Sequence, residues 1–298
     1  MSSFTDRLSV ETAGQVRALL ERATAADGVA PVSEQAVLSL DSASPARHLV
    51  DTRDGVVTGY ANLTPGHDEH PAMAEVAVDP QARGRGIGAA LVAAALAAGG
   101  PGARVWAHGD LPSARAVAAR LDLSVSRELW QMRRDLANPE LPELTVPDGL
   151  EIRTYAGPSD DAELLRVNNA AFAWHPEQGG WSESEIAARR AESWFDPKGL
   201  FIAVDPAAPE RILGFHWTKV HYDENPPIGE VYVVGIDPQA QGRGLGRLLT
   251  LAGLRYLDDR GLAAVLLYTE GDNTAAVHTY TRLGFVRFHT DIAYSAVG

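Results

Sequence analysis

Two stretches of this 298-residue chain have nearly the same sequence, and together they decide its fold. Residues 76–88 read VAVDPQARGRGIG, and residues 234–246 read VGIDPQAQGRGLG. They begin 158 residues apart, a period much longer than that of a solenoid repeat, so we interpret them as two copies of one domain. In each copy a Val-rich strand leads through Asp-Pro-Gln into a glycine-rich turn and then an apolar helix.

Hydrophobic periodicity on either side of the two stretches predicts a similar order of elements in each half. In the first half we predict helices over 13–25, 86–98 and 113–121, and strands over 47–51, 56–63, 73–78, 104–107 and 129–133. In the second half we predict helices over 162–172, 244–260 and 274–283, and strands over 151–154, 200–204, 212–221, 230–236, 264–269 and 286–293. The pattern predicts a mixed α/β protein.

The stretch between the halves is typical of a connector, because prolines stand at positions 139, 142 and 147 and cannot continue a helix. We expect an N-terminal domain over 1–138, a linker over 139–149 and a C-terminal domain over 150–298. Each domain then has about the commonest size of a globular domain.

The composition excludes several classes of protein. With 45% hydrophobic residues, 22% charged residues and a net charge of −13, the chain is globular and lacks the clustered Lys and Arg that nucleic-acid binding needs. The acidity suits a neutral or cationic small molecule, or simple solubility. The sequence has no cysteine, and we find neither a signal peptide nor an apolar stretch of membrane-spanning length. We expect a cytoplasmic monomer that binds no membrane.

The glycine turn at the start of each helix is a candidate phosphate site. Its backbone N–H groups point inward and the helix dipole favours an anion, while Arg83 and Arg85, or Arg243 and Arg247, add positive charge. A dinucleotide fingerprint fits poorly, because Arg247 stands where a small residue is needed. The Gly-Lys-Ser/Thr of a nucleotide-triphosphate loop is missing. A plain helix cap does not account for the same arginine-flanked turn in both halves.

Gln-x-x-Gly-x-Gly between a strand and a helix resembles the coenzyme A signature of the Gcn5-related N-acetyltransferase (GNAT) family. The chain carries it as QARGRG (81–86) and QAQGRG (239–244). The resemblance implies two tandem GNAT domains, each a mixed central sheet flanked by helices, with acetyl-CoA as co-substrate. It implies coenzyme contacts at Val76, Ala77, Val78, Gly84, Arg85, Gly86, Ile87, Gly88, Ala89, Val234, Gly235, Ile236, Gln241, Gly242, Arg243, Gly244, Leu245, Gly246, Arg247, Asn273, Ala275 and Ala276.

Segments outside that signature resemble the mycothiol synthase family. They are NNAAFAWHPEQGGW (168–181), GFHWTKVH (214–221), GEVYVVGID (229–237) and YTEGDNTAAVHTYTRLGF (268–285). This resemblance implies acetyl transfer to the cysteinyl amine of a small-molecule substrate, cysteinyl-glucosaminyl-inositol, giving mycothiol. It implies substrate contacts at Glu34, Glu177, Lys219, Glu230 and Tyr268. Transfer to an aminoglycoside or a polyamine, and an acyl-CoA sensor without turnover, stay open as alternatives.

Acetyl transfer to an amine needs a base for the amine proton and a donor for the departing thiolate. An α-amino group has a pKa of about 8, so a carboxylate suffices as base, and we assign that role to Glu230. Tyr280 is the candidate acid. The repeat places Ala72 opposite Glu230 and Ala118 opposite Tyr280. We therefore expect catalysis in the C-terminal domain, and coenzyme binding without turnover in the N-terminal one.

Two further positions separate the halves. The backbone N–H of Val234, beside Gly235, is the candidate partner of the thioester oxygen if the strand splays there; the first half has Ala77 in place of Gly235. Asn273, which begins the Tyr280 helix, either caps that helix or bonds the pantetheine arm of the coenzyme.

No metal site is expected. Residues 67–70 read HDEH and lack the i, i+4 spacing of a helical metal pair. His216 and His221 are an odd number of residues apart on one predicted strand, so they face opposite sides of the sheet.

Overall fold

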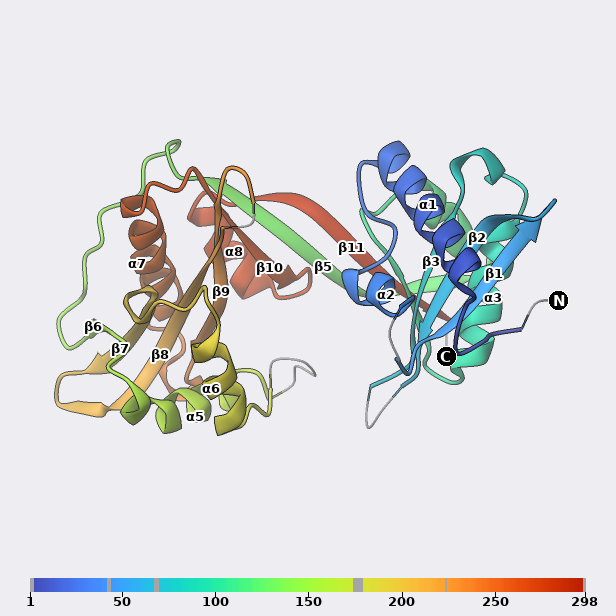
Figure 1. Ribbon diagram of the computed structural model, residues 1–298. Helices are drawn as coiled ribbons and strands as arrows, with labels where there is room; N and C mark the ends of the chain where they lie inside the picture. The colour runs from blue at the N-terminus through green and yellow to red at the C-terminus, as the bar shows by residue number, and fades with distance from the viewer. Residues whose placement is uncertain (1–2, 42–43, 67–69, 174–178, 223, 297–298) are drawn as a thin grey trace. The chain divides into compact units, whose positions relative to one another are not determined.

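The computed structural model describes residues 3–41, 44–66, 70–173, 179–222 and 224–296, and its contacts divide the chain into two units (Figure 1). Unit 1 contains residues 1–129 and 289–298, and unit 2 contains residues 130–288. These limits differ from the boundaries expected at 138 and 150: the first division falls within the strand at Leu123–Asp135, and the last strand of the chain pairs with unit 1. The α/β class is confirmed in both units.

Unit 1 is a mixed sheet with helices on both faces. Its helices are α1 (Val10–Asp27), α2 (Glu34–Leu38), α3 (Ile87–Gly99) and α4 (Pro112–Arg120); its strands are β1 (Arg47–Arg53), β2 (Val56–Thr64), β3 (Met73–Val78), β4 (Arg104–Ala107), the first part of β5 (Leu123–Asp135) and the end of β11 (Val286–Ala296). β1, β2 and β3 are antiparallel neighbours, and β4 joins β3 in parallel. β11 pairs antiparallel with β4.

Side chains alternate between the two faces of this sheet, as the period of a strand requires. Tyr60 and Ala77 pack with Leu19 of α1 in one buried cluster, and Figure 1 shows α1 lying along that face. Ala74 packs with Val92 of α3 in a second cluster. Each strand therefore contributes to two cores, which is why its apolar residues form nearly continuous runs.

Unit 2 repeats the plan. Its helices are α5 (Asp161–Ala171), α6 (Glu183–Ala191), α7 (Leu245–Asp259) and α8 (Thr274–Arg282), and its own strands are β6 (Glu151–Thr154), β7 (Leu200–Asp205), β8 (Ala208–His221), β9 (Ile228–Ile236) and β10 (Ala264–Glu270). β6 to β9 are antiparallel neighbours, and β10 is parallel to β9. Helix α6 was not predicted, although Ser182 and Glu185 begin it with a capping box.

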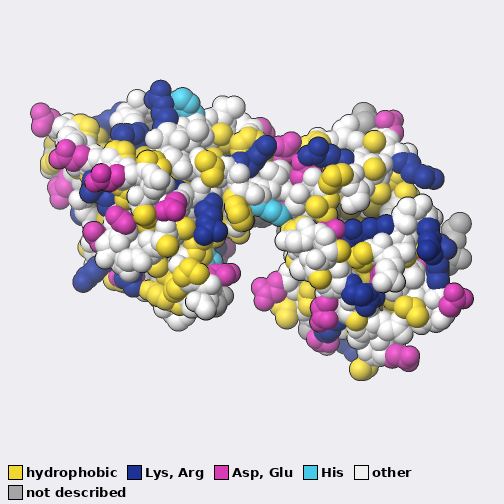
Figure 2. Space-filling model, turned by 90° about the horizontal axis from the view of Figure 1, so that it is seen from above, with side chains coloured by type: hydrophobic (Ala, Val, Ile, Leu, Met, Phe, Trp, Pro, Cys, Tyr) yellow, Lys and Arg dark blue, Asp and Glu magenta, His cyan; other side chains and the backbone are white. Residues whose placement is uncertain are grey.

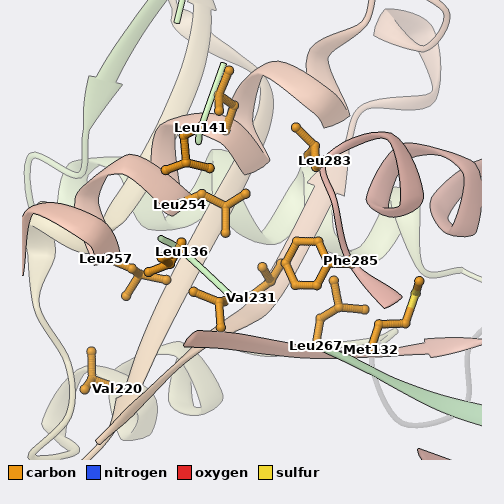
Figure 3. Packing of buried hydrophobic residues seen from close by; sticks show 12 residues of the cluster. Met132, Leu136, Leu141, Val220, Val231, Leu254, Leu257, Leu267, Leu283 and Phe285 are labelled. Atoms are coloured by element: carbon orange, nitrogen blue, oxygen red, sulfur yellow. The ribbon is translucent and has the colours of Figure 1, made fainter. Parts of the chain in front are cut away.

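The proline-rich stretch expected to be a linker packs onto unit 2. Leu141 of this stretch, and Leu136 just before it, are buried in one cluster with Leu254 of α7 and Val231 of β9 (Figure 3). Arg255 also donates to the carbonyl of Pro142 at 2.6 Å. Burial of two leucines favours this segment's attachment to the domain that follows it.

The surface carries charges of both signs. On the described part of the face shown in Figure 2, Lys and Arg side chains are interspersed with Asp and Glu and form no broad basic area. Within the described residues no helix is both long and apolar enough to cross a membrane.

Candidate active site

Strands β9 and β10 of unit 2 separate part-way along their length. They pair over residues 229–231, whereas β9 stays paired with β8 to its end. The N–H of Asp237 donates to the carbonyl of Leu213 at 2.9 Å. Along an antiparallel strand, N–H groups point alternately toward and away from the partner strand. The N–H groups of Val234 and Ile236 therefore point away from β8, toward the edge of β9 along which β10 is no longer paired.

A β-bulge on β9 lies beside this separation. The β8–β9 register pairs Trp217 with Val233 and Thr218 with Val231, so Tyr232 is an extra residue on β9. The matching β2–β3 ladder of unit 1 runs without a shift. A bulge increases local twist and re-aims the side chains around it, so unit 2 has a local geometry that unit 1 lacks.

The bulge corrects the internal alignment. A constant spacing between the two repeats placed Ala72 opposite Glu230. The extra residue on β9 shifts the alignment of the two units by one position before the bulge, so Met73 of unit 1 corresponds to Glu230. Met73 cannot accept a proton either. Gly235 also has a packing role, because a Cβ there would lie 2.6 Å from Cε1 of Phe215.

Glu230 is nearly buried, with 8% of its surface exposed. Its Oε2 lies 2.6 Å from Nε2 of His221, which stands on the adjacent strand. Lys219 is directly opposite Glu230 in the β8–β9 register. A carboxylate, an imidazole and an ammonium group therefore share one face of the sheet.

Aromatic rings surround the Lys219 ammonium. Its Nζ lies 5.2 Å from the ring centre of Trp194 and 5.7 Å from that of Tyr232, distances at which a cation is attracted to the ring faces. Arg189 of α6 donates to the Tyr232 hydroxyl at 3.1 Å and lies over the Trp181 ring at 3.8 Å. Helix α6, which the sequence analysis did not predict, thus supplies the arginine that holds the Tyr232 ring beside Lys219.

The second glycine turn leads into α7. Asp237 accepts from the N–H of Gln239 at 2.9 Å and from Arg166 at 2.7 Å, which fixes the turn's start. Gly242 and Gly244 have φ of +78° and +75°, a region that other residues rarely occupy. The exposed Arg243 lies between them. Backbone donors and a helix N-terminus here form a geometry suited to a pyrophosphate.

Unit 1 has the same turn, and a cavity lies beside it. A cavity of about 500 Å³ is lined by residues 76–78, the glycine turn, β4 and the start of α4. β3 and β4 pair over residues 73–75 and then part, as β9 and β10 do. Arg83, which lines the cavity, is held by two 2.7 Å bonds to Asp27, so its charge is already neutralised inside the protein.

Unit 1 also contains a carboxylate that sequence reasoning overlooked. Glu75 accepts from the N–H and hydroxyl of Ser33 at 2.7 and 2.9 Å and lies 2.8 Å from His108. Asp291 of β11 is the second acid beside His108. Burial lowers the pKa of His108, but hydrogen bonds to Asp291 and Glu75 outweigh it and raise the pKa to about 9. Unit 1 thus holds an acid–imidazole group of its own, at positions other than those that correspond to Glu230 and Tyr280.

Tyr280 lies on α8, half-buried, with its ring edge-on to Phe285 at 5.8 Å between centroids. Its hydroxyl has no hydrogen-bond partner among the described residues, and burial raises the pKa of Tyr280 to about 12. The group therefore stays protonated and free to donate. Asn273 accepts from the N–H of Ala276 at 3.2 Å, which makes it the cap of α8.

The predicted substrate residues are not all placed together. Tyr268 is 52% exposed on β10 and accepts from Gln131 at 2.9 Å. Glu34 is exposed at the start of α2 in unit 1, and Glu177 lies outside the described residues. Among the described residues, no three His, Asp or Glu side chains form a group that could hold a metal ion.

The residues that were missed share one cause, since each depends on a partner from another element. His221 is on the same face of β8 as Lys219, two residues away, and that spacing was the available signal. Glu75 and His108 meet only because β3 and β4 are neighbours, and a Glu inside a Val-rich strand was the signal there.

Comparison with known proteins matches both halves to one family. The profile described as the acetyltransferase (GNAT) family matches residues 16–120 and 167–285. A mycothiol acetyltransferase of Nocardia farcinica is 72% identical over 295 residues, covering 99% of this chain and 97% of the relative. One of Rhodococcus opacus is 65% identical, covering 99% and 98%, and one of Mycolicibacterium smegmatis is 57% identical, covering 95% and 94%.

Solved structures show the same fold at low sequence identity. A GCN5-related N-acetyltransferase from Sphaerobacter thermophilus matches with a TM-score of 0.72 and 22% identity, covering 99% of this chain and 97% of that one. A tandem GNAT protein from the clavulanic acid biosynthesis pathway matches with a TM-score of 0.65 and 22% identity over the same shares. The tandem architecture is therefore found in other proteins.

Proposed function

The chain belongs to the acetyltransferase (GNAT) family, and on that basis we propose that it moves the acetyl group of acetyl-CoA to the cysteinyl amine of cysteinyl-glucosaminyl-inositol, giving mycothiol. The high identity to full-length relatives named mycothiol acetyltransferase supports the substrate. The observation that carries the assignment to unit 2 is the nearly buried Glu230, beside the separated strands and across from Lys219.

Acetyl-CoA is proposed to contact the second unit at three places. The glycine turn, with Gln241, Gly242, Arg243, Gly244, Leu245, Gly246 and Arg247, offers backbone donors and positive charge to the pyrophosphate. The free N–H groups of Val234 and Ile236 face the place where an extended pantetheine arm can add to the strand edge. Asn273, Ala275 and Ala276 at the start of α8 complete the proposed contacts.

The chemistry is direct transfer. Glu230 takes a proton from the ammonium form of the acceptor, and the neutral nitrogen attacks the thioester carbon. The N–H of Val234 stabilises the negative charge that develops on the carbonyl oxygen. As the C–N bond forms and the C–S bond breaks, the nitrogen gives up its second proton, which ends on the departing sulfur to give the free thiol of coenzyme A, and the Tyr280 hydroxyl hydrogen-bonds that sulfur. With a pKa of about 12, this tyrosine mainly stabilises the thiolate.

The acceptor carries many hydroxyls and needs charged and aromatic groups around it. We assign Lys219, within its Trp194 and Tyr232 rings, to the sugar hydroxyls, and Tyr268 to a further hydroxyl. Glu177 stays in the proposal on the family pattern alone.

Unit 1 is proposed to bind the coenzyme without turnover. Its cavity and glycine turn support binding. The oxygens of Glu75, its buried carboxylate, already accept from Ser33 and meet His108, so they are poorly available to an amine. Arg85 is the exposed cation of this turn.

Replacing Arg243 and Arg247 together by Gln tests the phosphate contact. We expect the KM for acetyl-CoA to rise about 10²- to 10⁴-fold with little change in kcat, because each of the two lost charged hydrogen bonds costs about 1.5–3 kcal/mol. Initial rates at varied acetyl-CoA measure this. Arg282→Gln, an exposed arginine on α8, is the matched control. A KM that stays at the wild-type value would contradict the assigned phosphate site.

The product tests the proposed reaction. Purified protein is incubated with acetyl-CoA and cysteinyl-glucosaminyl-inositol, and mass spectrometry with NMR locates the new acetyl group. The proposal predicts acetyl on the cysteinyl nitrogen. An S-acetyl or O-acetyl product as the main species would overturn it.

A further inference from the structure

His221 lies in contact with the proposed base, and the reaction as described so far leaves it without a role. Its Nε2 is 2.6 Å from Oε2 of Glu230, and the two side chains are 24% and 10% exposed. His221 is two residues from Lys219 on β8, on the same face of the sheet. Among the described residues, His221 is the side chain that the structure records as a partner of Glu230.

A nearly buried base cannot lose its proton directly to solvent as an exposed base does. Glu230 receives a proton in every turnover and must lose it before the next acceptor binds, and with the acceptor and coenzyme in place the surrounding water is displaced. The imidazole is more exposed than the carboxylate. It therefore offers the proton of the carboxyl group a route to solvent.

The Lys219 ammonium does not compete for the same contact. It stands across the ladder from Glu230, but its Nζ lies over the rings of Trp194 and Tyr232. An ammonium group carries no lone pair, so Lys219 in its charged form cannot accept the proton from Glu230. Imidazole can accept at one nitrogen and release from the other.

We propose that His221 is a positioning residue that orients Glu230 and carries its proton to solvent, an inference that rests on the proposed function of unit 2. The ammonium N–H gives its proton to the Glu230 carboxylate. The Glu230 O–H then passes a proton to Nε2 of His221, and the Nδ1 proton leaves to water or to a buffer base. No other bond changes: Glu230 is again a carboxylate and His221 is a neutral imidazole protonated at Nε2. One proton has reached solvent, and the starting tautomer returns when the ring exchanges protons with water, Nε2 losing one and Nδ1 gaining one.

The test compares His221→Ala with His221→Gln in the full chain. We expect kcat to fall about 10-fold in both, less than for loss of a direct base, while the KM values for both substrates stay within about twofold of the wild type. Added imidazole should restore most of the rate in His221→Ala, where it can enter the vacated space. It should not do so in His221→Gln, where the amide fills that space.

His278→Gln, an exposed histidine on α8, controls for loss of a histidine elsewhere in unit 2, and thermal melting confirms that each variant is folded. An unchanged kcat, or a loss that imidazole does not relieve in His221→Ala, would overturn the proposal. Rates are compared on whichever amine the wild type acetylates. A wrong acceptor would thus refute the proposed substrate without deciding the role of His221.

Discussion

Replacing Glu230 by Gln should lower kcat by about 10²- to 10⁴-fold, the usual contribution of a positioned general base. Gln has nearly the same shape and can still bond His221 across the 2.6 Å contact, so the sheet should keep its geometry. It cannot take the proton of the ammonium acceptor. Steady-state rates give kcat, and titration calorimetry should give an unchanged affinity for coenzyme A.

The matched control is Glu210→Gln. Glu210 is an exposed acid on β8 of the same unit, and its replacement should leave kcat unaltered. The assignment of Glu230 as base fails if E230Q keeps more than about a tenth of the wild-type kcat, since that is far more than loss of a base allows.

Replacing Tyr280 by Phe should lower kcat by about 10²-fold, the effect of removing one donor to developing charge. The hydroxyl bonds no described residue, so its removal breaks no recorded hydrogen bond and the melting temperature should change little. Because burial raises the pKa of Tyr280 to about 12, the group is protonated throughout the neutral range. Stopped assays of thiol release give the rate.

Tyr222→Phe is the comparison for this variant. Tyr222 is 58% exposed in the same unit, and its hydroxyl accepts from Arg260 at 2.5 Å. We expect it to turn over at the wild-type rate. If Tyr280→Phe and Tyr222→Phe are equally active, the sulfur is stabilised by another group.

Much of the fold follows from the sequence because its signals are local. Strands β3, β4 and β6 have the bounds that alternation of apolar residues predicted, and the glycine turns end β3 and β9 where expected. The helices α1, α3, α5, α7 and α8 agree within a few residues. These elements carry a clear hydrophobic period or a proline or glycine at their ends.

The rest depends on pairing between distant segments. The extra residue at Tyr232 has no composition signal, because a bulge is defined by the partner strand. The Glu75–His108–Asp291 group needs β11 to lie beside β4, whereas the sequence assigned all of β11 to the second domain. Helix α6 is an exception, because it is short, with one buried residue, Ile186, yet it carries a local signal in its Ser182–Glu185 capping box that could have identified it.

Candidate site residues divide in the same way. Glu230, Lys219 and the glycine turn were found from the repeat and from family resemblance, and the structure places Glu230 and Lys219 opposite each other. His221 was considered only as a metal ligand. Its contact with Glu230 follows from the β8–β9 register, which the sequence alone does not define.

The central claim is tested most directly by kcat/KM for acetyl-CoA consumption by the purified chain, comparing cysteinyl-glucosaminyl-inositol with cysteine, glucosamine and an aminoglycoside. The account predicts a preference of at least about 10²-fold for the first, because the proposed site pairs a base for the cysteinyl amine with Lys219 for the sugar hydroxyls, and none of the other three amines presents both groups together. Equal or better turnover of the aminoglycoside, or no turnover of any amine, would contradict it.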